Sequence, residues 1–184
     1  MRKLKLQVQM SVDGFISGAN GEMDWMTFNW DDDLKNYVSE ITEPVDCIIL
    51  GRKLAQGFIP HWASLPEGEE GADKINNTKK VVFTKTLEES SWPNTSLAQG
   101  DLVEEIEKLK QEKGNDLIVY GGGSFVSSLI KNGLIDELHL FVNPVALGKG
   151  MPIFEALDGK QKFVLEASQT FSCGIVVLKY SKGA

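Results

Sequence analysis

The stretch that decides the fold runs from Asp116 to Ser124 and reads DLIVYGGGS. Its unbroken apolar run predicts a strand buried on both faces, and its glycines lead directly into a helical pattern that ends near Asn132. The first N–H groups of such a helix have no partner within the helix, and the helix dipole favours an anion there. The stretch therefore predicts a phosphate cradle at the carboxyl end of a central strand.

The glycine run also has a simpler explanation. Gly121, Gly122 and Gly123 match neither the GxGxxG fingerprint nor a P-loop. They would equally make a tight corner between strand and helix, although one glycine usually suffices for that. The pattern favours the phosphate cradle over the plain corner without excluding the corner.

A second cradle of the same kind follows the apolar run at residues 48–50. Gly51, Arg52 and Lys53 open the next helical segment there. Arginine grips phosphate in a bidentate way and lysine acts as a point charge, whereas a solvated basic pair would be the simpler explanation. Ligands of open α/β sheets bind at the carboxyl ends of the strands, so one dinucleotide could use both helix starts.

Strands and helices alternate along most of the chain, which predicts an α/β fold with a mostly parallel central sheet, helices on its faces and an antiparallel edge at the C-terminal end. The segment 4–10 alternates apolar and polar residues, so one of its faces is expected on the core. Residues 60–78 hold prolines, glycines and charges, which predicts a surface loop anchored by Trp62. Further strands are expected at 46–50, 80–84, 116–120, 136–143, 162–167 and 175–180, and helices at 31–42, 101–113 and 124–132.

Composition narrows the class of protein. The length of 184 residues predicts one domain, 1–184, and the formal charge of −7 argues against nucleic acid as a partner. No apolar run is long enough to span a bilayer and no signal-peptide core follows Met1, so membrane insertion and export are not expected and the protein is predicted to be cytoplasmic. Cys47 and Cys173 lie far apart without a CxxC partner, so no metal site is predicted.

These motifs resemble the dihydrofolate-reductase-like superfamily, most closely the branch that contains the reductase domain of riboflavin biosynthesis. In order and spacing the resemblance covers nearly the whole chain, and the run from Tyr120 to Phe154 is its most specific part. The matching stretches are residues 10–16, 46–53, 82–87, 121–124, 133–138, Pro144, 148–150 and 152–154.

The resemblance implies a dihydrofolate-reductase-like three-layer α/β/α fold, NADPH as cofactor and a pteridine-like or ribosylamino-pyrimidine-like substrate. On this resemblance Gly51, Arg52 and Lys53 look like the adenosine-side phosphate contact. Thr84 and Lys85 look like the site of the 2′-phosphate, and Gly121, Gly122, Gly123, Ser124 and Phe125 look like the pyrophosphate cradle.

The chain departs from the family pattern in two places. Leu54 stands where the family often has a hydroxyl residue after Gly-Arg-Lys, so one phosphate hydrogen bond is in doubt. The zinc-deaminase half that often accompanies the riboflavin reductase has no counterpart here, because no HxE with a PCxxC occurs in the sequence.

Hydride transfer to a heterocycle also needs a proton for the neighbouring ring nitrogen. Asp13, Asp24 and Asp33 are the candidate acids, with Asp33 and Asp13 preferred, and Asp33 resembles the substrate-binding acidic position of dihydrofolate reductases. A carboxyl group held against Trp25, Phe28 or Trp30 would have a raised pKa. Simpler explanations are a charge at the front of a helix for Asp33 and a turn residue for Asp13.

Aromatic and histidine side chains are further candidates for the substrate pocket. Trp25 and Trp62 are candidate walls of that pocket, although aromatic residues on loops are as often core anchors. His61 is a weaker candidate, and His139, which faces opposite to its neighbours Leu138 and Leu140, is expected at the surface.

The leading prediction is an NADPH-dependent reductase of a small heterocycle. A nucleotide-binding protein of the same fold without turnover is the alternative, because its binding glycines would look the same. An enzyme of riboflavin synthesis proper is a narrower possibility, since beyond Lys149 no basic residue is available for a ribose phosphate. The apolar strands expected at the C-terminal end offer an edge to which a second copy could pair, so a homodimer is kept as an alternative to a monomer.

Overall fold

Eight strands form one sheet in the computed structural model, which describes residues 1–183. Their order is β5-β4-β3-β6-β1-β7-β10-β9, and β2 pairs with β8 in a separate two-stranded sheet. The strands are β1 Leu4–Ser11, β2 Phe15–Ser17, β3 Val45–Gly51, β4 Lys79–Phe83, β5 Thr95–Ala98, β6 Asp116–Val119, β7 Glu137–Asn143, β8 Met151–Pro152, β9 Phe163–Thr170 and β10 Val176–Lys182. The helices are α1 Asp32–Thr42, α2 Arg52–Ser64, α3 Ala72–Asn77, α4 Leu102–Gln111 and α5 Gly123–Lys131.

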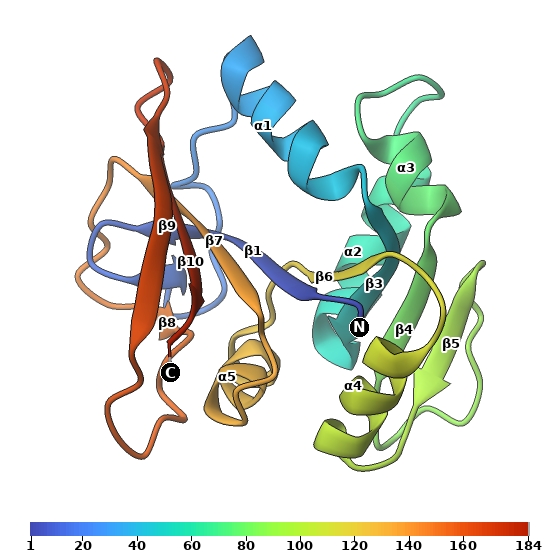
Figure 1. Cartoon of the computed structure of the whole chain (residues 1–184). Coiled ribbons are helices and arrows are strands. Elements are labelled where there is room, and N and C mark those ends of the chain that lie inside the picture. The colour runs from blue at the N-terminus through green and yellow to red at the C-terminus, as the bar shows by residue number, and fades with distance from the viewer. Residues whose placement is uncertain (184) are drawn as a thin grey trace.

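The main sheet is parallel from β5 to β7, and β10 is antiparallel to β7. Helices cover both faces, so the molecule has three layers (Figure 1). Helices α1, α2 and α3 pack on one face, and α4 and α5 pack on the other. This is the predicted architecture, including the antiparallel edge.

Consecutive apolar residues of the central strands point to opposite faces. In β3, Ile48 packs with α2, whereas Ile49 packs with α4 and α5. In β6, Ile118 and Val119 divide in the same way. Because both faces are covered, these strands read as continuous apolar runs in the sequence.

The expectation of one buried face for residues 4–10 is wrong. β1 lies between β6 and β7 at the centre of the sheet, and Lys5 and Gln7 are buried beside α1. Lys5 has an ion-pair partner there, because its Nζ lies 2.9 Å from Asp116 Oδ2. The polar residues of this strand therefore mark a polar layer under a helix and not a solvent face.

The surface loop predicted for residues 60–78 holds only for residues 65–71 and is wrong for the rest. Helix α2 continues through Pro60 to Ser64, and α3 occupies residues 72–77. Burial of Ala55 and Ile59 against the sheet holds α2 together although proline removes one backbone hydrogen bond. The short strands β2, β5 and β8 were not predicted, because each has too few residues to show a period.

His139 is buried and not at the surface. Its side chain does face opposite to Leu138 and Leu140, as the alternation predicts, but α1 covers that face. The Tyr37 hydroxyl lies 2.8 Å from His139 Nδ1. Burial raises the pKa of Tyr37 to about 12, so the phenol stays neutral.

β9 forms one edge of the sheet, and nearly all its residues are exposed. Pairing of two copies through this edge stays a prediction. Among the helices described in residues 1–183, none has the length and apolar character needed to cross a bilayer.

Candidate functional site

The carboxyl ends of β3 and β6 lie side by side, because Ile49 of β3 is the register partner of Val119 of β6. The helices that follow them diverge, since α2 packs on one face of the sheet and α5 on the other. Neighbouring strands whose helices leave on opposite faces form a topological switch point, where open α/β sheets bind ligands. We call the two helix starts, Gly51–Lys53 and Gly121–Phe125, the cradle.

The backbone of Gly121 and Gly122 needs glycine. Their φ angles are 149° and 87°, in the region that L side chains rarely adopt. A Cβ on Gly121 would meet no atom within 4 Å beyond its chain neighbours, so open space lies in front of it. Gly121 therefore leaves room for a ligand to approach the main chain, whereas a Cβ on Gly122 would contact Leu54 and Phe125.

Gly51 and Gly123 have packing explanations. A Cβ on Gly51 would lie 3.0 Å from Phe125 Cβ, so this glycine lets α5 approach the end of β3. At Gly123 an added Cβ would overlap the Met151 side chain. The close approach of Gly51 and Phe125 shows that the two halves of the cradle are in contact.

Both helices of the cradle begin without a side-chain cap. Elsewhere, Asp31 caps α1 and Asp101 caps α4 by accepting hydrogen bonds from the first N–H groups of each helix. An uncapped helix start leaves N–H donors and a positive dipole end free. The cradle therefore combines an open glycine with two sets of unused donors.

Cationic side chains also lie at the carboxyl ends of these strands. Arg52 and Lys53 occupy the first turn of α2, with Lys53 exposed and Arg52 partly so. Thr84 and Lys85 follow β4, which pairs with β3. Lys85 Nζ donates to the carbonyls of Gln99 and Gly100, at 2.7 and 2.6 Å.

Thr84 is buried, and its hydroxyl is already engaged. Its Oγ1 accepts hydrogen bonds from the N–H groups of Thr86 and Leu87, both at 3.1 Å. These bonds close the loop after β4 and fix the position of Lys85. The hydroxyl of Thr84 therefore shapes the predicted 2′-phosphate site through the loop.

Asp13 joins two loops that lie far apart in the sequence. Its carboxylate accepts hydrogen bonds from the Ser11 hydroxyl at 2.7 Å and from the N–H groups of Leu147 and Gly148 at 3.0 and 2.6 Å. The Ser11 hydroxyl and these N–H groups lower the pKa of Asp13 to about 2. A carboxylate in this setting is ionised at neutral pH and holds no proton to donate.

We expect Asp13→Asn to loosen the loop at residues 144–150. The amide keeps one acceptor oxygen but loses the negative charge that strengthens the hydrogen bonds from the N–H groups of Leu147 and Gly148, so exchange of these N–H groups should accelerate about tenfold. Hydrogen exchange followed by NMR measures this. In the wild type the clamp is complete above the ordinary aspartate pKa of 3.8 and is lost as the pH falls through the folded pKa of about 2. Unchanged exchange in Asp13→Asn at pH 7 would contradict the clamp.

The chain matches the family model of the RibD C-terminal domain over residues 2–177. It is 35% identical over 185 residues to the uncharacterized protein YyaP of Bacillus subtilis (strain 168), with 97% of this chain and 94% of that protein covered. The uncharacterized protein YwjB of the same strain is 29% identical over 170 residues, with 92% of each chain covered.

The chain belongs to the RibD C-terminal domain family.

The fold also matches the crystal structure of a diaminohydroxyphosphoribosylaminopyrimidine deaminase/5-amino-6-(5-phosphoribosylamino)uracil reductase from Thermotoga maritima. The TM-score is 0.73 at 20% identity, and the alignment covers 99% of this chain and 57% of that chain. This RibD C-terminal domain therefore has the expected dihydrofolate-reductase-like fold, and its family is one of riboflavin-biosynthesis reductase domains.

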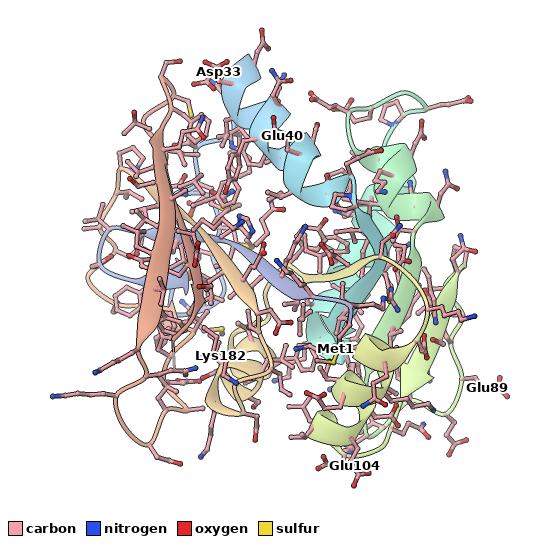
Figure 2. All side chains as sticks on the ribbon, in the orientation of Figure 1. Met1, Asp33, Glu40, Glu89, Glu104 and Lys182 are labelled. Atoms are coloured by element: carbon pink, nitrogen blue, oxygen red, sulfur yellow. The ribbon has the colours of Figure 1, made fainter. Side chains whose placement is uncertain are left out.

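Asp33 does not lie in the apolar pocket that was expected for it. It is exposed in the first turn of α1, at the outer end of that helix (Figure 2). Asp31 is the N-cap and accepts from Ser172 Oγ and from the N–H groups of Leu34 and Cys173. The catalytic role of Asp33 stays a prediction.

The two tryptophans occupy different ends of the molecule. Trp25 is half-buried in the loop between β2 and α1, and its Nε1 donates to the Glu22 carbonyl at 3.0 Å. Trp62 lies ten residues beyond the start of α2, roughly 15 Å from the cradle at 1.5 Å per residue. Trp62 packs with Phe58, so the structure favours a core anchor over a wall of the substrate pocket.

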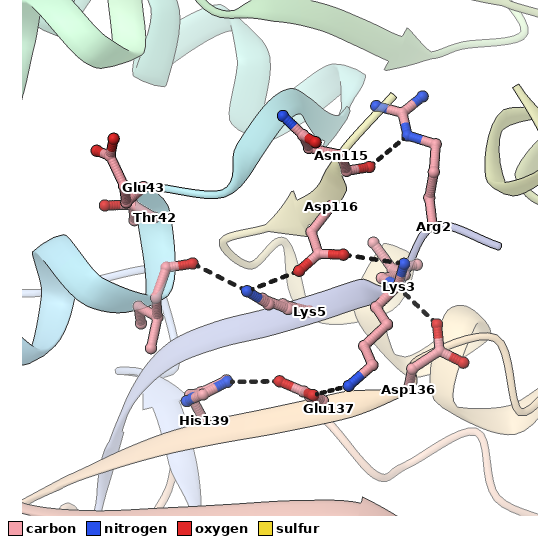
Figure 3. A network of polar contacts seen from close by, with 12 residues as sticks. Arg2, Lys3, Lys5, Thr42, Glu43, Asn115, Asp116, Asp136, Glu137 and His139 are labelled. Carbon is pink, nitrogen blue, oxygen red and sulfur yellow. Dashed lines mark hydrogen bonds and ion pairs between the residues drawn. The ribbon is translucent and has the colours of Figure 1, made fainter. Parts of the chain in front are cut away.

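A network of charged side chains lies at the amino-terminal ends of the parallel strands, opposite the cradle (Figure 3). Glu137 binds Lys3 at 2.7 Å and faces His139 Nε2 at 3.4 Å. Arg2 pairs with Asp46 and donates to the Asn115 carbonyl. A hollow at this edge is lined by Arg2 and its neighbours, but its buried cations are already paired, so it is structural.

Sequence reasoning missed three residues at the carboxyl edge. Met151 covers Gly123, and Asn143 accepts from the Thr27 N–H at 2.8 Å while donating to Gln9 Oε1 at 2.8 Å. The alternation of apolar and polar residues in β1 gave no sign that Gln9 would pair with Asn143. The two partners of Asn143, Thr27 and Gln9, lie more than a hundred residues from it in the sequence, beyond the reach of local patterns.

Proposed function

We propose that this RibD C-terminal domain is an NADPH-dependent reductase that passes hydride to a small heterocycle. The observation that carries the proposal is the contact of two uncapped helix starts at one switch point, with open space in front of Gly121. One diphosphate bridge fits this arrangement of donors.

Each part of the cradle has its own role in this proposal. The N–H groups at the start of α5 and α2 hold the diphosphate, and Arg52 and Lys53 add positive charge on the adenosine side. Lys85 meets the 2′-phosphate after exchanging its carbonyl contacts for it. NADPH supplies the hydride when bound, and the chain orients it toward the ends of β1 and β7.

We assign the proton to water at the open end of the site. Asp13 is ionised and engaged with the loop at 144–150, and Asp33 is exposed at the start of α1. Neither carboxyl group lies in an apolar pocket of the kind that keeps a general acid protonated near neutrality. We therefore expect the rate of NADPH oxidation to change little with pH near 7, because no buried acid titrates there.

The first experiment mixes the purified protein with NADPH and follows the absorbance of the reduced cofactor. Folate-like, flavin-precursor and quinone acceptors form the panel. Consumption of NADPH with any heterocycle supports the reductase. Binding without consumption across the panel favours a nucleotide-binding protein, and absence of binding contradicts the cradle itself.

Lys85→Ala should weaken NADPH binding roughly tenfold and leave NADH binding unchanged, because a charge-assisted hydrogen bond to the 2′-phosphate is lost. Calorimetric titration with both cofactors measures this difference. Lys79→Ala, which removes an exposed lysine at the other end of β4, is the matched control. Equal losses for NADPH and NADH would exclude Lys85 from the 2′-phosphate site.

A further inference from the structure

We propose that Met151 is an oxidation-sensitive gate of the cradle: a hydroperoxide converts its thioether to a sulfoxide, and the new oxygen occupies the N–H donors at the start of α5. The proposal rests on the function proposed above, because the loss it describes is a loss of dinucleotide binding. Three observations support it: the position of the sulfur atom, the free donors beside it and its access to solvent.

The backbone at Met151 is held against β2. Met151 begins β8, where it is the register partner of Ser17. The preceding residue, Gly150, lies so close to β2 that an added Cβ would overlap the Ser17 carbonyl. β8 also contacts α5, so Met151 lies between the β2–β8 pair and the cradle.

The thioether of Met151 lies against the first residue of α5. A Cβ added to Gly123 would overlap both Sδ and Cγ of Met151, and Gly123 itself is buried. Gly123 is the first helical residue of α5, and Gly122 before it is the N-cap. The sulfur atom therefore lies at the helix start that we assign to the diphosphate.

The N–H donors at this helix start are unused. Val126 makes the first backbone hydrogen bond of the helix, because its N–H donates to the Gly122 carbonyl at 2.9 Å. Three further N–H groups donate to no group within residues 1–183: those of Gly123, Ser124 and Phe125. A thioether sulfur is only a weak acceptor, so reduced Met151 leaves these donors to a ligand.

An oxidant can reach this sulfur from solvent. Met151 is 38% exposed, whereas Met10 is buried. Met1 and Met23 are more exposed, but Met1 lies at the amino-terminal ends of the strands and Met23 lies in the loop between β2 and α1. Met151 therefore combines solvent access with contact to the cradle.

The oxidation step needs only a hydroperoxide as co-reactant. A sulfur lone pair of Met151 attacks one peroxide oxygen, so the S–O bond forms and the O–O bond breaks. Sulfur loses two electrons to the peroxide, whose other oxygen leaves as water or, from an organic hydroperoxide, as an alcohol. Methionine sulfoxide reductases reverse the change. A dithiol then supplies two electrons and two protons, becomes a disulfide, and the sulfoxide oxygen leaves as water.

The sulfoxide oxygen acts as a cap for α5. It carries partial negative charge and accepts hydrogen bonds, and both the free N–H groups and the helix dipole favour such an atom. The carboxylates of Asp31 and Asp101 cap α1 and α4 in the same way. A diphosphate must displace this internal acceptor before it can bind at α5, so oxidation weakens dinucleotide binding and protects the first amides of the helix.

The test compares wild type, Met151→Leu and Met23→Leu, each before and after treatment with hydrogen peroxide. The peroxide is removed, oxidation of each methionine is mapped by mass spectrometry, and NADP⁺ binding is measured by titration calorimetry. We expect oxidation to weaken binding about tenfold in wild type and in Met23→Leu, and to leave Met151→Leu at its own untreated affinity. Methionine sulfoxide reductases with a dithiol should restore the affinity of the oxidised wild type.

Met151→Gln separates a cap from simple damage. Its amide oxygen is an acceptor of similar reach, so this variant should bind NADP⁺ about tenfold more weakly than Met151→Leu without any peroxide. Hydrogen exchange of the Ser124 and Phe125 amides is then followed by NMR without ligand. Exchange should be slower in Met151→Gln and in the oxidised wild type than in the reduced wild type, and faster exchange would contradict the cap.

Equal losses of affinity in wild type and Met151→Leu, or unchanged affinity once Met151 is mapped as its sulfoxide, overturn the inference. Resistance of Met151 to a peroxide dose that oxidises Met23 does the same. In these cases the reduced wild type still binds NADP⁺, so the reductase proposal stands. If the reduced wild type does not bind NADP⁺, the cradle itself fails and the gate fails with it.

Discussion

Gly122→Val is expected to weaken NADPH binding about a hundredfold, equivalent to about 2.7 kcal/mol. Gly122 has a φ of 87° and caps α5, so a branched side chain there strains the turn and enters the space assigned to the diphosphate. Leu54 and Phe125, whose Cβ atoms would lie 3.7 and 3.9 Å from the new Cβ, limit how far the side chain can turn away.

Strain and ligand contact can be separated with a matched variant. Gly68 has a φ of 83° in an exposed loop, and a Cβ there would meet no atom within 4 Å. Gly68→Val should therefore lower the free energy of unfolding to a similar extent and leave the NADPH dissociation constant unchanged. If both variants lose affinity equally, or neither does, Gly122 has no special place in binding.

Glu137→Gln is expected to destabilise the protein by about 2 kcal/mol at pH 7. The side chain of Glu137 is 11% exposed and ion-pairs with Lys3 and Lys179. It also faces His139 Nε2 (Figure 3). Glutamine keeps the shape but removes the charge on which these contacts depend. Urea unfolding of both proteins measures the difference, and Glu89→Gln, an exposed surface change, is the control.

The pH dependence of this loss has a definite sign. The contact with His139, followed by Lys3 and Lys179, lowers the pKa of Glu137 well below the ordinary glutamate value of 4.5. A lowered pKa contributes stability above the unfolded pKa and loses it as the pH falls. The gap between wild type and Glu137→Gln should therefore shrink below pH 4.5, and a gap that widens on acidification would contradict this assignment.

The sequence predicted the architecture because its central strands are covered on both faces. The apolar runs that end in Gly51 and Gly121 marked β3 and β6 and the helices after them. Use of both helix starts by one dinucleotide stays a prediction; the structure adds that Gly51 and Phe125 bring the two starts into contact. Local pattern was sufficient here because each strand is flanked by its own helix.

Other features depend on contacts between distant segments. His139 has the alternation of a surface residue, and only the packing of α1 buries it. The local pattern places Trp62 in a loop because Pro60 usually ends a helix, whereas burial of Ile59 keeps α2 intact. The clamp of Asp13 on Gly148 spans 135 residues and leaves no local signal.

The central claim is that the starts of α2 and α5 jointly hold one diphosphate. Backbone amide NMR during titration with NADP⁺ tests it most directly, because the amides of residues 51–53 and 121–125 report separately. We expect saturable shifts in both groups with one shared dissociation constant. Shifts in only one group, or different dissociation constants for the two, would contradict the claim.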